Sequence, residues 1–495
     1  MPYGSTILTV QYGQFSAGLA MDHLKLNNIV GFGLAGLGLV ACASVPELGK
    51  EPAPRAVTQI SQSLAAPPTE WPSDEWWHAY ADPQLDALIA EALKGAPSLA
   101  QAQARVAKAQ AVAGETRATL YPTLEADGNY AEVKESLNQG FPPQFSQYLP
   151  RGYNSSAYLA LKFGYEFDFW GKNRAAIAAA TSEVRASQAD AAEARLALSS
   201  AMALAYSDLG RLYAEHDVDE RSAQVKEETA ALVQRRMDNG LDTRATLKEA
   251  EAGVPAARAQ LAAVDEEIAH TKNRIAALMG AGPDRGIEIT RPTGAHLRAF
   301  GMPQQLQAQL LGRRPDIVGA RWRAEEAAKR IHVARAEFYP NINLSAYIGQ
   351  QALFAHLLFK DSSQIGSVGP AVTLPIFEGG LLRDQYRGAR ADYDAAVASY
   401  DATLVQALQE LADAAASERA LDVRLSESRA ALAADEEAYK LIRMRYEGGL
   451  AAYQTVLIAE DAVLQARITV ADLDARAFTL DVQLVQALGG GYVAS

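Results

Sequence analysis

The stretch Leu120-Tyr121-Pro122-Thr123-Leu124 recurs in the second half of the chain as Phe338-Tyr339-Pro340-Asn341-Ile342. Each copy follows an earlier proline at the same spacing, Pro97 in the first half and Pro315 in the second. Two later pairs match in the same order: Arg236–Leu241 with Arg445–Leu450, and Ala277–Gly280 with Ala487–Gly490. Solenoid repeats have periods of roughly 20 to 50 residues, far shorter than this one. The sequence therefore predicts an internal two-fold duplication.

Two short strands with a loop between them are predicted after each Tyr-Pro pair. Between Tyr158 and Phe169, apolar and aromatic side chains alternate with Lys162, Gly164, Glu166 and Asp168. A period of two indicates a strand with two different faces. The four predicted strands lie at about 123–133, 157–169, 341–349 and 367–377.

The length and alternation of these strands suit a sheet that crosses a bilayer. A membrane-spanning strand needs roughly 9 to 11 residues. In such barrels apolar side chains face lipid and polar ones face the interior, which predicts that Lys162, Glu166 and Asp168 face the lumen. A small soluble sheet packed on helices explains the alternation equally well, so the strands alone leave both structures open.

Long helices are predicted for most of the remaining sequence. Arg174–Ala214 and Arg383–Arg424 contain no proline and are rich in Ala, Glu, Arg, Gln and Leu, which favour helix. A helix of about 40 residues is roughly 60 Å long. The helical segment that returns antiparallel to it would need two pieces to match this length. An ordinary coiled coil would account for these helices but not for the strands.

The amino-terminal residues match a bacterial lipoprotein signal. A short basic region after Met21 precedes an apolar run from Ile29 to Ala41, and Leu39-Val40-Ala41-Cys42 fits a lipobox. We predict that residues 1–20 are an upstream mis-start, that 21–41 are the signal peptide, and that Cys42 is lipidated. Residues 42–70 contain several prolines and are predicted to form a linker that carries the anchor away from the body.

Composition argues against several classes of protein. The net charge of −13 gives no basic surface for nucleic acid. Mean hydropathy is −0.10, and no apolar run reaches the roughly 18 residues of a membrane-spanning helix. The 7 histidines show no metal-ligand spacing, and no phosphate-binding or nucleophile motif is present. We expect no enzyme activity, no catalytic residues, no metal and no cofactor.

Several motifs together resemble those of the outer-membrane efflux proteins, in particular the lipoprotein NodT/OprM type of TolC-like channel. The motifs are Trp76-Trp77, Asp82–Ile89, the two Tyr-Pro pairs, Asp168–Arg174, Arg313–Ile317, Pro375–Gly380 and Arg445–Leu457. The resemblance covers Trp71 to Gly490. It implies a homotrimer in which each chain gives four strands to one 12-stranded β-barrel, continued by a long periplasmic α-helical tunnel. It also implies partners: a periplasmic adaptor protein and an inner-membrane RND-type pump.

The physics of the bilayer also requires an oligomer. Four strands cannot close a barrel, since single-chain outer-membrane barrels begin at about eight. Open strand edges in lipid would leave backbone groups unsatisfied. The expected fold class is therefore mainly α with a membrane β-barrel. Residues 71–280 form the first outer-membrane efflux repeat, with helices over 172–280, and 281–302 are a linker. Residues 303–490 form the second repeat, with helices over 381–489, and 491–495 are a tail.

The helical turns after Arg236 and Arg445 are the predicted periplasmic tips. Glycine suits a helix end because it accepts a positive φ. The resemblance implies that Gly240, Leu241, Gly449 and Leu450 also contact the adaptor.

A gate is expected just past the second tip. Family members such as OprM carry an Asp and an Arg there, and this chain has Ile458 and Asp461 instead. We expect a ring of three Ile458 side chains to close the mouth by dewetting, with Glu460 or Asp461 adding a negative field. A solvated acidic helix face explains the two acids equally well. The remaining gate candidates are two tyrosines and two possible basic partners of the acids: Tyr446, Tyr453, Arg244 and Lys248.

The expected function is an outer-membrane exit duct of a tripartite efflux system that passively conducts drugs or other toxic small molecules. The protein is expected in the bacterial outer membrane, lipid-anchored and in contact with lipid. Two alternatives remain: a type I secretion exit duct for polypeptides, and a structural envelope lipoprotein that transports nothing. Neighbouring genes for a pump and an adaptor would discriminate between them.

Overall fold

The computed structural model describes residues 45–55, 64, 66–134, 136, 148, 150–293, 301–303 and 306–494. These residues belong to two compact units. The strand unit contains Thr123–Trp170 and Ala334–Gln385, and the helical unit contains Leu48–Pro122, Gly171–Val333 and Tyr386–Ser495. The predicted signal peptide and Cys42 lie outside the described residues.

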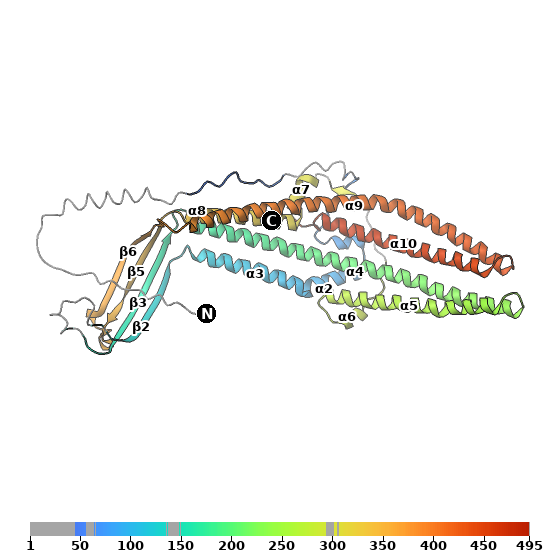
Figure 1. Ribbon diagram of the computed structural model, residues 1–495, viewed down its shortest axis with the longest axis horizontal. Coiled ribbons are helices and arrows are strands. Elements are labelled where there is room, and N and C mark those ends of the chain that lie inside the picture. The colour runs from blue at the N-terminus through green and yellow to red at the C-terminus, as the bar shows by residue number, and fades with distance from the viewer. Residues whose placement is uncertain are drawn as a thin grey trace. The chain divides into compact units, whose positions relative to one another are not determined.

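The strand unit is built on one antiparallel sheet of four strands (Figure 1). The strands are β2 (Thr123–Val133), β3 (Asn154–Phe167), β5 (Asn341–Ala352) and β6 (Gln364–Thr373), in the order β2-β3-β5-β6. Two short 3-10 helices, η3 (Ala355–Leu357) and η4 (Asp361–Ser363), lie between β5 and β6. β6 ends before Pro375 and not at the predicted residue 377. It contains Pro370, which has no N–H to donate to a neighbouring strand and is tolerated because β6 is an edge strand of the sheet in the single chain.

Helices of matching length occur in both halves of the chain. α3 (Pro97–Ala118) and α8 (Pro315–Ala336) each have 22 residues. α4 (Lys172–Asp238) and α9 (Leu381–Glu447) each have 67 residues, and α5 (Arg244–Leu278) and α10 (Tyr453–Ala487) each have 35. α4 and α9 extend well beyond the predicted stretches of about 40 residues. No proline interrupts either helix.

In the helical unit, α4 packs against two shorter helices along its length. α3 packs on α4, and α5 returns beside it after the turn at Asp238 (Figure 1). α3 and α5 are thus the two shorter helices that together match the length of α4. We call α4 and α5 the first hairpin and α9 and α10 the second hairpin. α10 packs on α4 and so joins the two hairpins.

A girdle of small elements packs on two buried clusters of the helical unit. It includes η1 (Trp76–Tyr80), α2 (Pro83–Gly95), α6 (Pro283–Ile287), α7 (Leu306–Arg313) and the parallel pair β1 (Pro68–Thr69) and β4 (Met302–Pro303). Trp76, Trp77 and Tyr80 are at most 3% exposed and belong to the same buried cluster as Met202 of α4. The Trp-Trp motif therefore holds η1 on α4 through apolar burial.

Two polar motif residues also have structural roles here. Asp82 caps α2 by accepting backbone N–H groups of Gln84 and Leu85 at 2.9 and 3.1 Å, and it accepts the Tyr206 hydroxyl at 2.8 Å. Arg314, buried ahead of α8, donates to Glu410 of α9 at 2.8 Å and to the carbonyl of Ala487 at 3.1 Å. Buried polar groups need such partners, so these motifs specify how the helices meet.

Residues 50–55, which belong to the predicted linker of residues 42–70, lie on α9. Arg390 donates to the carbonyl of Lys50 at 2.6 Å, and Tyr393 donates to that of Pro52 at 3.3 Å. The N–H of Arg55 donates to Asp401 at 2.9 Å. Proline-rich backbone leaves carbonyls free for such side-chain donors, and α9 supplies them.

In the described part of the chain, no helix has both the length and the apolar character needed to cross a membrane.

Candidate functional site

The two predicted tips are the turns that join α4 to α5 and α9 to α10. Gly240 has a φ of +72° and Gly449 a φ of +77°, the left-handed conformation that favours glycine. Leu241 and Leu450 each donate their N–H to a carbonyl of the preceding helix at 2.8 Å, as in a Schellman helix end. Their side chains are 63% and 74% exposed. Each turn thus presents one leucine to solvent in the single chain.

A polar contact that was missed in the sequence joins the two hairpins near their tips. Arg236 of α4 donates to Asp242 at 2.6 Å and to the backbone carbonyl of Tyr446 at 2.8 Å. The Tyr446 hydroxyl donates to the same carboxylate at 2.9 Å, and the guanidinium lies 4.4 Å from the centre of its ring. The Arg236 and Asp242 side chains are only 12% and 14% exposed. Charge-assisted hydrogen bonds are the stronger class, so this network ties α9 to the first hairpin.

The two tyrosines predicted for the gate are buried within one chain. Tyr446 is 1% exposed and Tyr453 is 6% exposed, with ring centroids 5.9 Å apart. They share an apolar cluster with Val233, Leu247 and Val456. Burial raises the pKa of Tyr453 to about 12. Both tyrosines therefore pack the hairpins together.

The two acids of α10 lie in different surroundings. Glu460 is 4% exposed, whereas the Asp461 side chain is 70% exposed. A carboxylate enclosed by its own chain does not present its charge to a wet mouth, so the expected negative field would come from Asp461 alone.

The basic partner of these acids within one chain is Lys226 of α4, and not Arg244 or Lys248. Its Nζ lies 3.2 Å from Glu460 and 3.8 Å from Asp461. Lys248 pairs instead with Glu251 of its own helix. Lys226 is the partner of Glu460 and Asp461 because α4 packs against α10.

Ile458 is 65% exposed in the single chain. It is three residues from Asp461, and side chains at this spacing share a helix face. An exposed apolar residue and an exposed acid thus lie together on α10, two turns past the second tip.

The pairing register places apolar side chains of all four strands on one face of the sheet. Phe163 lies opposite Leu124 of β2 and Ala346 of β5, and Ala346 lies opposite Val368 of β6. Directly opposed residues in antiparallel strands point to the same side. The larger members of this face are Leu124, Tyr130, Leu159, Leu161, Phe163, Tyr165, Phe167, Ile342, Leu344, Ile348, Val368 and Val372.

The opposite face of the sheet is polar. Lys162 lies opposite Glu125 and forms an ion pair with Asp127. Glu166 lies opposite Asn343. Asp168, predicted for the same face, follows the end of β3 at Phe167. The sheet therefore separates an apolar side from a charged side, as the alternation of the sequence indicated.

A comparison with known families decides the identity of this fold. The sequence model described as outer membrane efflux protein matches residues 88–281 and 306–490. The chain belongs to the outer membrane efflux protein family. The family resemblance of the motifs, the efflux function and the outer-membrane location are thereby confirmed.

Relatives and solved structures of outer membrane efflux proteins agree with this assignment. The multidrug resistance outer membrane protein MdtP of Escherichia coli (strain K12) is 29% identical over 466 residues, 93% of this chain and 94% of that protein. The fusaric acid resistance protein FusA of Burkholderia cepacia is 36% identical over 329 residues, 65% of this chain and 60% of that protein. The outer membrane protein VceC of Vibrio cholerae has a crystal structure with 42% sequence identity and a TM-score of 0.78. The match covers 85% of this chain and 100% of that one.

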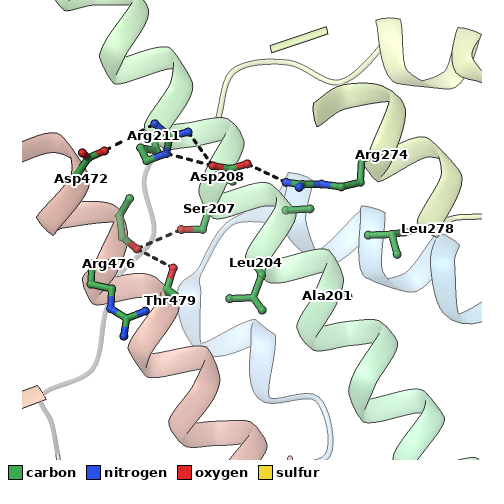
Figure 2. A pocket seen from close by; sticks show the side chains of 12 residues that line it. Ala201, Leu204, Ser207, Asp208, Arg211, Arg274, Leu278, Asp472, Arg476 and Thr479 are labelled. Carbon is green, nitrogen blue, oxygen red and sulfur yellow. Dashed lines mark hydrogen bonds and ion pairs between the residues drawn. The ribbon is translucent and has the colours of Figure 1, made fainter. Parts of the chain in front are cut away.

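This efflux protein also has a cavity of about 700 Å³, with charged residues among its lining, between α4, α5 and α10 (Figure 2). Asp208 accepts from Arg211 at 3.1 Å and from Arg274 of α5 at 2.8 Å. Arg211 also lies 3.7 Å from Asp472 of α10. The charges around the cavity are therefore largely paired with one another, and their network connects both hairpins.

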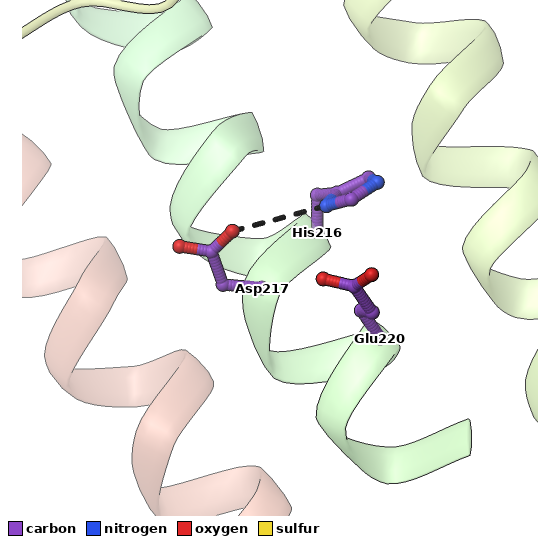
Figure 3. A group of neighbouring side chains, drawn as sticks. All are labelled: His216, Asp217 and Glu220. Atoms are coloured by element: carbon purple, nitrogen blue, oxygen red, sulfur yellow. Dashed lines mark ion pairs between the residues drawn. The ribbon is translucent and has the colours of Figure 1, made fainter. Parts of the chain in front are cut away.

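One cluster in the efflux protein could offer metal ligands, which the spacing of histidines did not suggest. His216, Asp217 and Glu220 of α4 have ligand atoms within 4.8 Å of one another (Figure 3). Arg291 already donates to Asp217 at 2.8 Å, and this hydrogen bond lowers the pKa of Asp217. His216 also lies 3.4 Å from Asp265 of α5. We assign no metal to this cluster, since the Asp217 carboxylate is engaged by an arginine.

Proposed function

We propose that three copies of this chain form the exit duct of a tripartite efflux system in the outer membrane. The observation that carries the proposal is the sheet with one apolar face, one polar face and two unpaired edges. β2 and β6 are the edges, and each pairs with only one neighbour in the described chain. Lipid does not satisfy the free backbone groups of such edges.

Closure by other copies removes both edges. If β6 of one chain pairs with β2 of the next, three chains make a barrel of about 12 strands, a size known for outer-membrane barrels. The apolar face, including Leu161, Phe163 and Val368, then meets lipid. Lys162 and Glu166 line the lumen, and Asp168 lies at its end.

The matched helices support a continuous tunnel built from a duplicated half. In this proposal residues 71–280 and 303–490 are the two repeats, joined by 281–302. A helix of 67 residues is about 100 Å long, which is enough to extend far into the periplasm. Two similar hairpins per chain then give six similar hairpins around one axis.

The tips and the mouth are the proposed points of contact and control. Gly240 and Gly449 shape the turns, and the exposed Leu241 and Leu450 offer apolar contacts to an adaptor protein bound to an RND-type pump. Ile458 of three chains forms an apolar constriction by dewetting.

The substrates proposed for this duct are toxic small organic molecules. Two relatives are named for resistance to multiple drugs and to fusaric acid. The duct itself is passive, and the pump sets the choice of substrate. An ABC transporter gene beside this one, in place of an RND-type pump gene, would favour the secretion of polypeptides.

The proposal is tested with the purified full-length protein. Native mass spectrometry should give a trimer, and the trimer should conduct ions across a planar bilayer, more so after the tips are loosened by removing the Arg236 network. Deleting the gene should increase susceptibility to small toxic compounds. A monomer, or a trimer without conductance after loosening, would favour a structural lipoprotein.

A further inference from the structure

A second cavity, of about 310 Å³, lies where the second hairpin packs against α4. Its walls include Arg221 of α4, Tyr439 and Arg443 of α9, and Glu460 and Arg467 of α10. The cavity is thus enclosed by residues of both hairpins. Any change in how the hairpins pack will change its shape and its access to water.

Glu460 has the least satisfied polar atoms in the described walls of this cavity. The residue is 4% exposed, and neither carboxylate oxygen accepts a hydrogen bond in the described chain. Lys226 approaches to 3.2 Å but without hydrogen-bond geometry. The Tyr439 hydroxyl is also buried without a hydrogen-bond partner. An ionised carboxylate in such a place bears a large desolvation cost, which protonation removes.

The charges that face Glu460 come from all three helices. Lys226 of α4 and Arg443 of α9 favour its ionised form, whereas Asp461 of α10 disfavours it. Burial is the largest effect, and it raises the pKa of Glu460 above its ordinary value.

The remaining charged groups of the walls form ion pairs with other residues of the helices. Arg467 pairs with Glu436 at 2.7 Å. Arg221 lies 3.7 Å from Glu228, and Arg443 lies 3.6 Å from the same residue. These pairs leave Lys226 as the cation directly opposite Glu460.

We propose that Glu460 is a proton-binding site that couples the two hairpins of each chain. Glu460 belongs to the second hairpin and Lys226 to the first, so separating the hairpins exposes the carboxylate to water and restores its ordinary acidity. Proton binding therefore favours the packed hairpins, and proton release favours their separation. Each unit of pKa difference between the packed and separated forms changes their ratio about tenfold. Any effect of this proton-binding site on the opening of a tunnel mouth rests on the proposed function.

The packing of the hairpins can be measured without reference to transport. Spin labels at Gln224 of α4 and Gln465 of α10, both exposed in the single chain, report the distance between hairpins by pulsed electron spin resonance. The full-length protein is used with Cys42 replaced by Ser. We expect a short, narrow distance distribution at about pH 4, below the ordinary glutamate pKa of about 4.3, and a longer or broader one at about pH 8.

Three variants decide whether Glu460 is the titrating group. Glu460→Gln resembles the protonated form and should stay packed at both pH values. Glu437→Gln makes the same change at an exposed acid of α9 and should respond as the wild type does. Lys226→Met removes the opposing cation and should move the midpoint to higher pH, which gives a second test if Glu460→Gln fails to fold.

A wild-type distance that does not change with pH, or a Glu460→Gln variant that still responds, would overturn the proposal. Conductance of the same samples separates this inference from the proposed function. If the distances respond to pH as expected and the trimer never conducts, the proton site stands and the duct does not.

Discussion

Ile458 tests the proposed constriction most directly because it is exposed and apolar in the single chain. In a trimer, Ile458→Asp would place three like charges at short range, and their repulsion and hydration favour a wet, open mouth. We expect single-channel conductance well above that of the wild type. Asp461→Asn is the matched comparison: it should reduce cation preference and leave the mouth closed. An Ile458→Asp channel with wild-type conductance would rule out the apolar constriction.

Glu193 of α4 predicts a pH dependence of stability. Burial, together with Asp316 and Glu410, raises the pKa of Glu193 to about 7, against the opposing effect of Arg314. A raised carboxyl pKa means that the folded state holds a proton that the unfolded state releases. The contribution of Glu193 to the free energy of unfolding is therefore fully present below about pH 4.5 and is lost as the pH rises to about 7.

Glu193→Gln should remove this loss of stability. At about pH 8 we expect the variant to unfold at a higher temperature than the wild type, with a free energy of unfolding larger by up to about 3 kcal/mol. At about pH 4.5 we expect no gain. Thermal melting at both pH values provides the measurement. Equal gains at the two values would mean that the effect is one of packing and not of ionisation.

The sheet makes a prediction about its two faces. Phe163→Arg places a charge on the apolar face and should cost about 2 to 4 kcal/mol near the middle of the bilayer, with a low yield of trimer. Ser345→Arg is a matched change on the polar face, opposite Gly164 in the register, and should mainly alter conductance. Gly164 itself is a poorer control, because an added Cβ would lie 3.0 Å from the Thr123 hydroxyl. Equal trimer yields for the two arginine variants would contradict the assignment of faces.

The anchor concerns the protein as a whole, because it decides where the mature chain begins. Cys42 is the last residue of the predicted lipobox Leu39–Cys42, and Ala43 after it is typical of lipoproteins sorted to the outer membrane. Mass spectrometry of the mature amino-terminal peptide should find lipidated Cys42 as its first residue. Since the proposed barrel inserts by itself, Cys42→Ser should lower assembly without abolishing membrane residence. An intact peptide spanning residues 30–50 would exclude processing at this site.

The local features of this protein could be predicted from the sequence because each depends on neighbouring residues. Alternation along Tyr158–Phe169 specifies two strand faces, and the observed register extends those faces across four strands. Gly240 and Gly449 mark helix ends because positive φ is a property of the residue itself. The proline-free stretches of about 40 residues cover only part of α4 and α9, because helix propensity alone does not mark where a helix begins and ends.

The environment of each side chain at the tips depends on contacts between residues far apart in the sequence. Glu460 and Asp461 are adjacent and both lie near Lys226 of α4, yet the packed helices cover Glu460 and leave most of the Asp461 side chain exposed. The contacts of Lys226, and the network of Arg236, Asp242 and Tyr446, could be identified only in the tertiary structure, because they join the two hairpins. A helix period indicates which residues share a face, but burial depends on which partner covers that face, and this partner is supplied by another part of the chain.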